Sequence, residues 1–446
     1  MEPARPAGDE QLELDVGEVA QGGWCVAREP GGRVVLVRHA LPGERVLARL
    51  TEVTSRFARA EATEILDASP DRVEPPCPHA RPGGCGGCDW QHASLAAQRQ
   101  FKAAVIGQQL RRIAGLDREV TVEPLPGDED GLGWRTRVRF AVRPGGLAGL
   151  RQHRSHDIID IGTCPIAHPL VNEAAVTRGR WPGATSVAAV TSPETEERAV
   201  VVTPAGPPRP RGSRGRPGGR PPGRAPSAVS RAAWPEQVTG PVLVTGSAGL
   251  TALRGGPFLH RAAAGRTWRT SAGVFWQVHP AAADVLAGAV SEVLRPEPGD
   301  VALDLYCGAG LFAGTLAAAV GPSGEVIGIE SDRAAVRDAR HNLRATPWAR
   351  VHRGDVAEVL GQAQWDQASL AVLDPPRVGV ARPALDQLLR PGGALRRVAY
   401  VSCDPATLAR DIAVFAEAGW QLGALRAFDA FPMTHHVECV ATLTRE

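Results

Sequence analysis

The chain reads VALDLYCGAG at residues 301–310, an apolar strand pattern that runs directly into a glycine-rich turn. The residues after the turn have a helical pattern. Further strand patterns alternate with helical ones, at 325–330, 370–373, 397–402 and 437–444. This alternation indicates a parallel or mixed sheet with helices on both faces. The sequence therefore predicts an α/β, Rossmann-like domain over residues 262–446.

The glycine-rich turn also predicts a ligand site. Glycine lets the backbone approach a ligand closely, and a helix N-terminus favours negative groups such as a carboxylate. Glu330 ends the second predicted strand, where its carboxylate can accept both ribose hydroxyls of an adenosyl group. The G-x-G-x-x-G spacing is incomplete, so S-adenosylmethionine suits the turn better than a dinucleotide pyrophosphate. Asp355 follows the third strand, where it either binds the adenine or caps a loop.

A second turn, DPPR at residues 374–377, closes the fourth predicted strand. Two prolines fix the backbone, so the carboxylate of Asp374 can be held where the methyl-donating cofactor meets its substrate. Amino-group methyltransferases use a similar turn, but an aromatic residue follows their prolines. Arg377 stands there instead, which favours a carbon acceptor and therefore requires a nucleophile elsewhere.

The stretch YVSCDPATL at residues 400–408 supplies a candidate nucleophile. It places Cys403 at the end of an apolar strand, on a turn that opens a helix. Pro405 suits the first helical turn and Asp404 is a good N-cap. The positive field of the helix N-terminus favours a thiolate. The alternative is an inert, buried cysteine.

Carbon 5 of uracil is an example of a carbon acceptor that needs a nucleophile. Addition of a thiolate at C6 makes C5 electron-rich, and a base must later remove the C5 proton. Glu438 lies within an otherwise apolar strand, where partial desolvation should raise its pKa toward that of a useful base. The alternative is a strand-edge acid paired to an arginine.

The N-terminal half divides into two expected parts. Short strand patterns separated by Gly and Pro turns predict a small β-barrel of the oligonucleotide-binding kind over residues 10–68. Residues 69–261 predict an α+β middle domain, with a helix over 95–113. Within it, a Pro-, Arg- and Gly-rich insertion at 204–234 cannot bury enough apolar surface to order itself, so we expect it to be disordered.

The middle domain holds a cysteine cluster. Cys77, Cys85 and Cys88 have the spacing C-x7-C-x2-C, and Cys164 lies further along the chain. Four thiolates suit either an iron–sulfur cluster or a structural zinc ion. Nearby histidines at 79 and 92 keep zinc as an alternative.

The net charge of +2 is nearly balanced, so only local patches can argue for nucleic-acid binding. Arginines and aromatics interleave in WRTRVRF at 134–140, which makes Arg135 and Arg137 candidate RNA contacts; an exposed basic strand edge is the alternative. The sequence has neither the apolar core of a signal peptide nor a membrane-spanning run. Eight cysteines in so long a chain are too few for a secreted disulfide scaffold, and the cluster at 77–88 suggests metal binding in a reducing compartment. We expect a cytoplasmic monomer without an obligate protein partner.

Together these motifs resemble the RNA 5-methyluridine methyltransferases, the bacterial 23S rRNA and tRNA uracil-5 enzymes. The resemblance covers nearly the whole chain and is carried by FWQV at 275–278, DLYCG at 304–308, DPPR at 374–377, SCDP at 402–405 and HVE at 436–438. It implies a TRAM-like barrel, a middle domain and a class I methyltransferase domain.

The resemblance also implies roles for individual residues. Cys403 would be the nucleophile and Glu438 the base. The methyl donor, S-adenosylmethionine, would be bound by Gln277, Tyr306, Gly308, Glu330, Asp355 and Asp374. The four cysteines would hold a 4Fe–4S cluster, with Cys164 as the fourth ligand. Because the tRNA members typically lack these cysteines, 23S rRNA is the expected substrate.

Three positions depart from the family pattern: His279 and Asp404 each replace a common Asn, and Leu311 follows the glycine turn where some members have Asn. None of them removes a group that the chemistry requires. Two alternatives remain at this point: a tRNA uridine methyltransferase, and a non-catalytic RNA-binding or folding factor.

Overall fold

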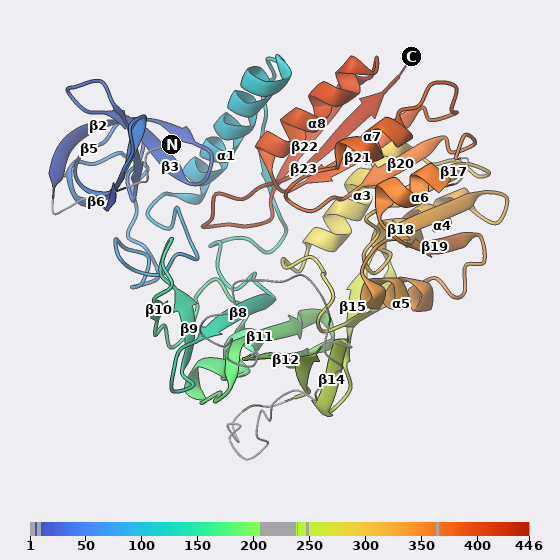
Figure 1. The fold of residues 1–446 in the computed structure, drawn as a ribbon, viewed down its shortest axis with the longest axis horizontal. Helices are drawn as coiled ribbons and strands as arrows, with labels where there is room; N and C mark the ends of the chain where they lie inside the picture. Colours follow the sequence, from blue (N-terminus) through green and yellow to red (C-terminus); the bar gives the residue numbers. More distant parts are fainter. Residues whose placement is uncertain are drawn as a thin grey trace, which may run out of the picture.

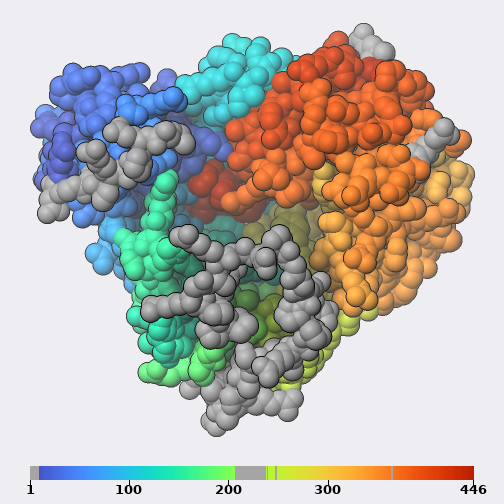
Figure 2. Space-filling view, viewed as in Figure 1, coloured from blue at the N-terminus to red at the C-terminus, as the bar shows by residue number. Residues whose placement is uncertain are grey.

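The structure is a computed structural model that describes residues 5–6, 10–205, 238, 240–246, 249–362 and 365–445. Three parts lie around the centre of the molecule: an N-terminal barrel, a middle sheet and a larger C-terminal sheet covered by helices (Figure 1). The face seen in Figure 2 is hollowed where these parts meet.

The N-terminal part is a closed barrel. Its strands are β2 (Gln11–Ala20), β3 (Trp24–Arg28), β4 (Val34–Arg38), β5 (Arg45–Val53) and β6 (Phe57–Asp67), and the short β1 (Arg5–Pro6) pairs with β5. The barrel closes because β5 pairs with β2 on one side and with β6 on the other, while β6 also pairs with β4. Alternate residues point inward; Val35 and Val37, for example, are fully buried. The predicted barrel is confirmed.

The C-terminal part is an eight-stranded mixed sheet with the order β19-β18-β17-β20-β21-β23-β22-β7. Its strands are β17 (Val301–Leu305), β18 (Glu325–Glu330), β19 (Ala349–Arg353), β20 (Leu370–Leu373), β21 (Arg397–Ser402), β22 (Gln421–Asp429), β23 (Glu438–Thr444) and β7 (Val122–Pro124). Strands β17 to β21 run parallel, and β23 runs antiparallel to its neighbours. This confirms the predicted Rossmann-like α/β fold.

Helices bury both faces of this sheet in two separate cores. One core contains side chains of α3 (Ala282–Leu294), α4 (Leu311–Val320) and α5 (Arg333–Asn342). The other contains side chains of α6 (Val356–Gln362), α7 (Arg382–Leu388) and α8 (Pro405–Glu417). Both faces are therefore apolar, and polar groups collect at the strand ends.

The middle part is a seven-stranded sheet with the order β10-β9-β8-β11-β12-β13-β14. Its elements are β8 (Arg137–Val142), β9 (Ala148–Arg151), β10 (Ile158–Ile159), α2 (Pro169–Glu173), β11 (Ala184–Ser192), β12 (Glu197–Pro204), β13 (Val242–Gly246) and β14 (Gly249–Arg254). A hairpin of β15 (Phe258–Ala263) and β16 (Arg266–Ser271) leads to the C-terminal part. From residue 206 on, the insertion predicted at 204–234 lies outside the described residues.

One segment of the predicted middle domain belongs structurally to the C-terminal sheet. The predicted helix over 95–113 is present as α1 (Leu95–Gln109), continued by a π-helical turn, η1 (Leu110–Ala114). Ile106 and Leu110 are buried in the core beneath α8, and β7 extends the sheet by pairing with β22. This segment of the predicted middle domain thus packs on a sheet that is distant in the chain, which chain order alone does not reveal.

None of the described helices combines the length and the apolar character that a membrane crossing requires.

We expect Phe415→Ala to destabilise the C-terminal part by about 3–5 kcal/mol, because the ring is fully buried and its removal leaves a cavity. Phe275→Ala is the matched control, since that ring is 62% exposed and should change stability by no more than about 0.5 kcal/mol. Urea unfolding curves of the three proteins make the comparison. Equal losses in both variants would contradict the packing described above.

Candidate active site

The turn after β17 has the backbone geometry of a ligand cradle. Tyr306 has a φ of 68° although it carries a side chain, and Gly308 and Gly310 also have positive φ. A Cβ built on Gly308 meets nothing within 4 Å, so the turn faces open space. The Gly308 amide donates to Glu330 Oε2 at 3.1 Å, which brings the carboxylate predicted to bind ribose directly over the turn.

Two further acids lie beside this turn, Asp304 and the partly buried Asp374. Asp304 is fully buried at the end of β17, and burial raises its pKa to about 8; the neighbouring carboxylates of Asp374 and Glu330 add to the rise. One oxygen of Asp304 accepts a hydrogen bond from the Ala313 amide at 2.6 Å, and the other has no partner among the described residues. Burial alone raises the pKa of Asp374 to about 7.

Pairing of β21 with β23 places the two predicted catalytic residues together. Ser402 pairs with Cys439 at the end of the ladder, so Cys403 and Glu438 follow as the next opposed positions. Pro405 is in the first turn of α8, and Asp404 caps the helix by accepting from the Thr407 amide at 2.9 Å. The predicted turn around the thiol is thus confirmed.

Burial raises the pKa of both residues of this pair. Burial raises the pKa of the Cys403 thiol to about 12, the Glu438 carboxylate adds to the rise, and Arg377 opposes it. Burial therefore opposes the thiolate that the helix N-terminus favours. Glu438 is 4% exposed, and burial, aided by Asp374, raises its pKa well above the usual value, as predicted.

Arg377 and His436 are two residues of this site to which sequence reasoning gave no role. The Arg377 guanidinium lies 3.0 Å from His436 Nε2, between the proline turn and the β22–β23 connection. Its charge lowers the pKa of both Cys403 and Glu438 against the effect of burial. Both residues stand in the DPPR and HHVE motifs, but only the fold shows that these two motifs lie side by side.

Helix α8 fixes the proline turn from the other side. Thr407 Oγ1 donates to the Arg377 carbonyl at 3.0 Å. Asp411 Oδ2 accepts from the Val380 amide at 2.9 Å and from the Tyr400 hydroxyl at 2.5 Å. The helix that begins beside the thiol therefore also holds the turn that carries Asp374.

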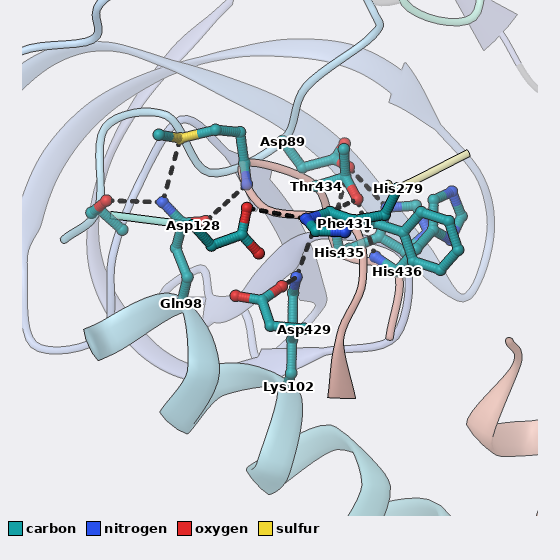
Figure 3. Close-up of polar contacts among 12 residues, drawn as sticks. Asp89, Gln98, Lys102, Asp128, His279, Asp429, Phe431, Thr434, His435 and His436 are labelled. Carbon is teal, nitrogen blue, oxygen red and sulfur yellow. Dashed lines mark hydrogen bonds and ion pairs between the residues drawn. The ribbon is translucent and has the colours of Figure 1, made fainter. Parts of the chain in front are cut away.

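The remaining predicted donor contacts have mixed surroundings. Gln277 is buried, with 8% of its surface exposed. Asp355 Oδ1 accepts from the amides of Ala357 and Glu358, which is the capping arrangement that the sequence left open as an alternative. The unusual His279 is buried and lies 3.0 Å from Asp128 (Figure 3), so this departure from the family pattern is accommodated by an acid partner.

The four predicted metal-ligating cysteines, Cys77, Cys85, Cys88 and Cys164, line one cavity of about 630 Å³ in the middle part. They are close enough to influence one another electrostatically. In the described part of the chain, no group of three or more His, Cys, Asp or Glu side chains is arranged to hold a metal ion. The four thiols therefore share one cavity with several other side chains.

The two predicted RNA contacts make internal contacts. Arg137 donates to the carbonyls of Val274 and Gly273, at 2.7 and 3.3 Å, and so holds the chain just before the FWQV motif. Arg135 lines the cysteine cavity. The interleaved aromatics Trp134 and Phe140 are buried core residues, at 3% and 2% exposed. An RNA role for the two arginines stays a prediction.

The sheet order and the glycine turn define a class I methyltransferase fold. Residues 258–395 match the family Protein-L-isoaspartate(D-aspartate) O-methyltransferase (PCMT), residues 362–446 match tRNA (Uracil-5-)-methyltransferase, and residues 10–63 match the TRAM domain. An uncharacterized RNA methyltransferase of Streptomyces avermitilis is 49% identical over 97% of this chain and 98% of its own. The 23S rRNA (uracil(1939)-C(5))-methyltransferase RlmD of Acidithiobacillus ferrooxidans is 34% identical over 93% of each chain.

Among solved structures, the Pyrococcus abyssi tRNA (uracil-54, C5)-methyltransferase in complex with S-adenosyl-L-homocysteine has a TM-score of 0.70 and 23% identity, and the match covers 97% of this chain and 100% of that one. This likeness shows a shared fold. The family matches and the relatives above confirm the resemblance stated from the motifs: the chain belongs to the tRNA and rRNA uracil-5-methyltransferase family with a TRAM domain. It is an S-adenosylmethionine-dependent RNA methyltransferase.

The raised pKa of Asp304 predicts a specific pH dependence of stability. An unfolded Asp ionises near pH 4, whereas the folded group holds its proton to about pH 8. The folded state therefore binds more protons in this window, so stability falls as pH rises, by at most about 1.4 kcal/mol per pH unit from this group. Asp304→Asn should flatten the decline between pH 5 and 8 in urea unfolding.

The control is Asp300→Asn. Hydrogen bonds and Arg396 lower the pKa of Asp300 against the effect of burial, so its titration lies below this window. The slope between pH 5 and 8 should then match the unsubstituted protein. An Asp304→Asn protein with an unchanged slope would contradict the buried, protonated state of Asp304.

Proposed function

We propose that this enzyme methylates C5 of a uridine in 23S rRNA through a covalent bond between Cys403 and C6 of the ring. The observation that carries this proposal is the adjacency of Cys403 and Glu438 at the strand ends, beside the donor turn. The activity named for the Acidithiobacillus relative, which aligns along nearly the whole chain, supports 23S rRNA as the substrate. The non-catalytic alternative lacks support, since the named relatives are methyltransferases.

The chemistry begins at sulfur. Cys403, once deprotonated, forms a bond to C6 of the flipped uracil, and the electrons of the C5=C6 bond move toward O4. When bound, S-adenosylmethionine would supply an electrophilic methyl group on its sulfonium; C5 would form a bond to this methyl group as the S–CH3 bond breaks, and the donor would leave as a neutral thioether. Glu438 then accepts the C5 proton, the C5=C6 bond re-forms, and the sulfur leaves C6 as a thiolate.

The surroundings of the pair suit this sequence. Arg377 offers a positive charge to both groups, so it opposes the burial that keeps them protonated in the free protein. The donor would lie across the glycine turn and along the buried acids. We propose Gln277, Tyr306, Gly308, Glu330, Asp355 and Asp374 as its contacts.

We further propose that Cys77, Cys85, Cys88 and Cys164 hold a 4Fe–4S cluster. Four thiols that line one cavity are a ligand set that suits either such a cluster or a zinc ion. The family resemblance favours the cluster. The cluster would order the middle domain; the methyl transfer itself needs no redox step. We expect the enzyme to act as a monomer, with Arg135 and Arg137 near the RNA.

Trapping on 5-fluorouridine RNA tests the proposed reaction. Fluorine at C5 cannot leave as a proton, so the methylated adduct should persist as a protein–RNA band on a denaturing gel. Cys403→Ala should abolish this band and lower methylation roughly a thousandfold or more. Cys25→Ala, a buried barrel cysteine, is the control and should still form the adduct.

The same assay separates the substrates. Adduct with a 23S rRNA fragment and none with tRNA transcripts supports the proposal. Adduct with tRNA alone would transfer the proposal to the tRNA reaction, and methylation without any adduct would overturn the covalent route.

The metal proposal has its own measurement. Protein purified without oxygen should be brown and contain iron and sulfide at about four each per chain. Cys164→Ser should lower both, whereas Cys25→Ser should leave them unchanged. Zinc in place of iron would contradict the cluster.

A further inference from the structure

The segment that leads into Glu438 is held by residues far away in the chain. This segment, residues 430–437, is called the catalytic loop here. Its residue Met433 has a φ of 66°, a left-handed conformation that side chains rarely adopt. Such a conformation persists where the surroundings over-determine it, and it is frequent at functional sites.

Four hydrogen bonds from residues 89–98 fix Met433. The amides of Asp89 and Trp90 both donate to its carbonyl, at 2.9 and 3.1 Å. The Gln98 side chain accepts from the Met433 amide at 2.8 Å and donates to its sulfur at 3.3 Å. The strained residue is thus clamped by the start of α1 and by the segment that precedes it.

Asp89 also makes a charged contact to His435, which lies two residues closer to Glu438 in the chain than Met433 does. Its Oδ2 accepts from the His435 amide at 3.1 Å and lies 2.6 Å from His435 Nδ1. Its Oδ1 accepts from Arg38 of the barrel at 3.1 Å. Asp89 directly follows Cys88, so one buried carboxylate joins the barrel, the cysteine segment and the catalytic loop.

The contact continues to the reacting groups. The rings of His435 and His436 have centroids 4.0 Å apart, and His436 lies 3.0 Å from the Arg377 guanidinium. Glu438 begins β23 immediately after this loop. By contrast, Cys403 lies at the start of α8, where the Asp404 cap holds the backbone.

We propose that Asp89 is a positioning residue for Glu438, acting through His435 and the clamped backbone of Met433. The inference rests on the proposed function, in which Glu438 removes the C5 proton in the last step. Loosening the catalytic loop should displace Glu438 more than Cys403. The adduct should then form and accept its methyl group nearly as before, but break down slowly.

Single-turnover measurements on the full-length enzyme test this, with a 23S rRNA fragment carrying ordinary uridine. Asp89→Asn removes the charge but keeps the shape of the side chain. We expect adduct breakdown to slow roughly tenfold to a hundredfold, because small misplacements of a catalytic group have effects of that size. Transfer of labelled methyl into RNA should change far less. A general loss of stability would slow both steps together.

Glu44→Gln is the matched control. Glu44 is a buried acid of the barrel, paired with Arg72, and none of its hydrogen bonds reaches the catalytic loop. It should leave both rates unchanged. Slow breakdown in Glu44→Gln as well would mean that any buried charge of the barrel has this effect, and would overturn the inference.

His435→Ala is a second variant that tests the same inference, and it can be used even if Asp89→Asn does not fold. It should slow breakdown to a similar extent, and the double variant should be no slower than either single one, because both act through one contact. Independent, additive effects would overturn the inference. If the unsubstituted enzyme forms no adduct even with 5-fluorouridine RNA, the proposed function itself fails. If it does and Asp89→Asn clears its adduct at the normal rate, only the role of Asp89 fails.

Discussion

The antiparallel pairing of β21 with β23 is the constraint on which the active site depends. It opposes Cys403 to Glu438 just beyond the Ser402–Cys439 pair. A slip of one residue in this register would turn one of the two side chains to the other face of the sheet. Both strands are buried on both faces, so the apolar cores that stabilise the fold also enforce the register. The site is therefore as stable as the sheet that carries it.

The second feature of the site is that its ionisable groups are shielded from water. Asp304, Asp374 and Glu438 all have raised pKa values because burial disfavours their charged forms, and the Cys403 thiol has one for the same reason. Arg377 is the opposing positive charge beside the thiol and Glu438. In the proposed reaction, the positive charges of the methyl donor and of Arg377 would offset this burial where negative charge develops.

The three parts of the molecule meet at this site. Residues 95–124 precede the middle sheet in the chain but cover and extend the C-terminal sheet. Helix α1 of this segment also contains Gln98, which contacts Met433. Lys102 of the same helix is fully buried; it pairs with Asp429 and donates to the Phe431 carbonyl at 3.1 Å. Unpaired, such a charge would be costly in the interior, so these contacts tie the helix to the catalytic loop at a defined place.

The sequence alone determined the features that are local in the chain. The strand, glycine turn and helix at 301–320, the barrel strands and the cap at Asp404 follow from short patterns, because neighbouring residues set backbone conformation. It also singled out Cys403 and Glu438. Only the tertiary structure decided that Arg377 meets His436, that Asp89 contacts His435, and that burial raises the pKa of the thiol. These depend on desolvation and on contacts between residues distant in the chain, which no local pattern encodes.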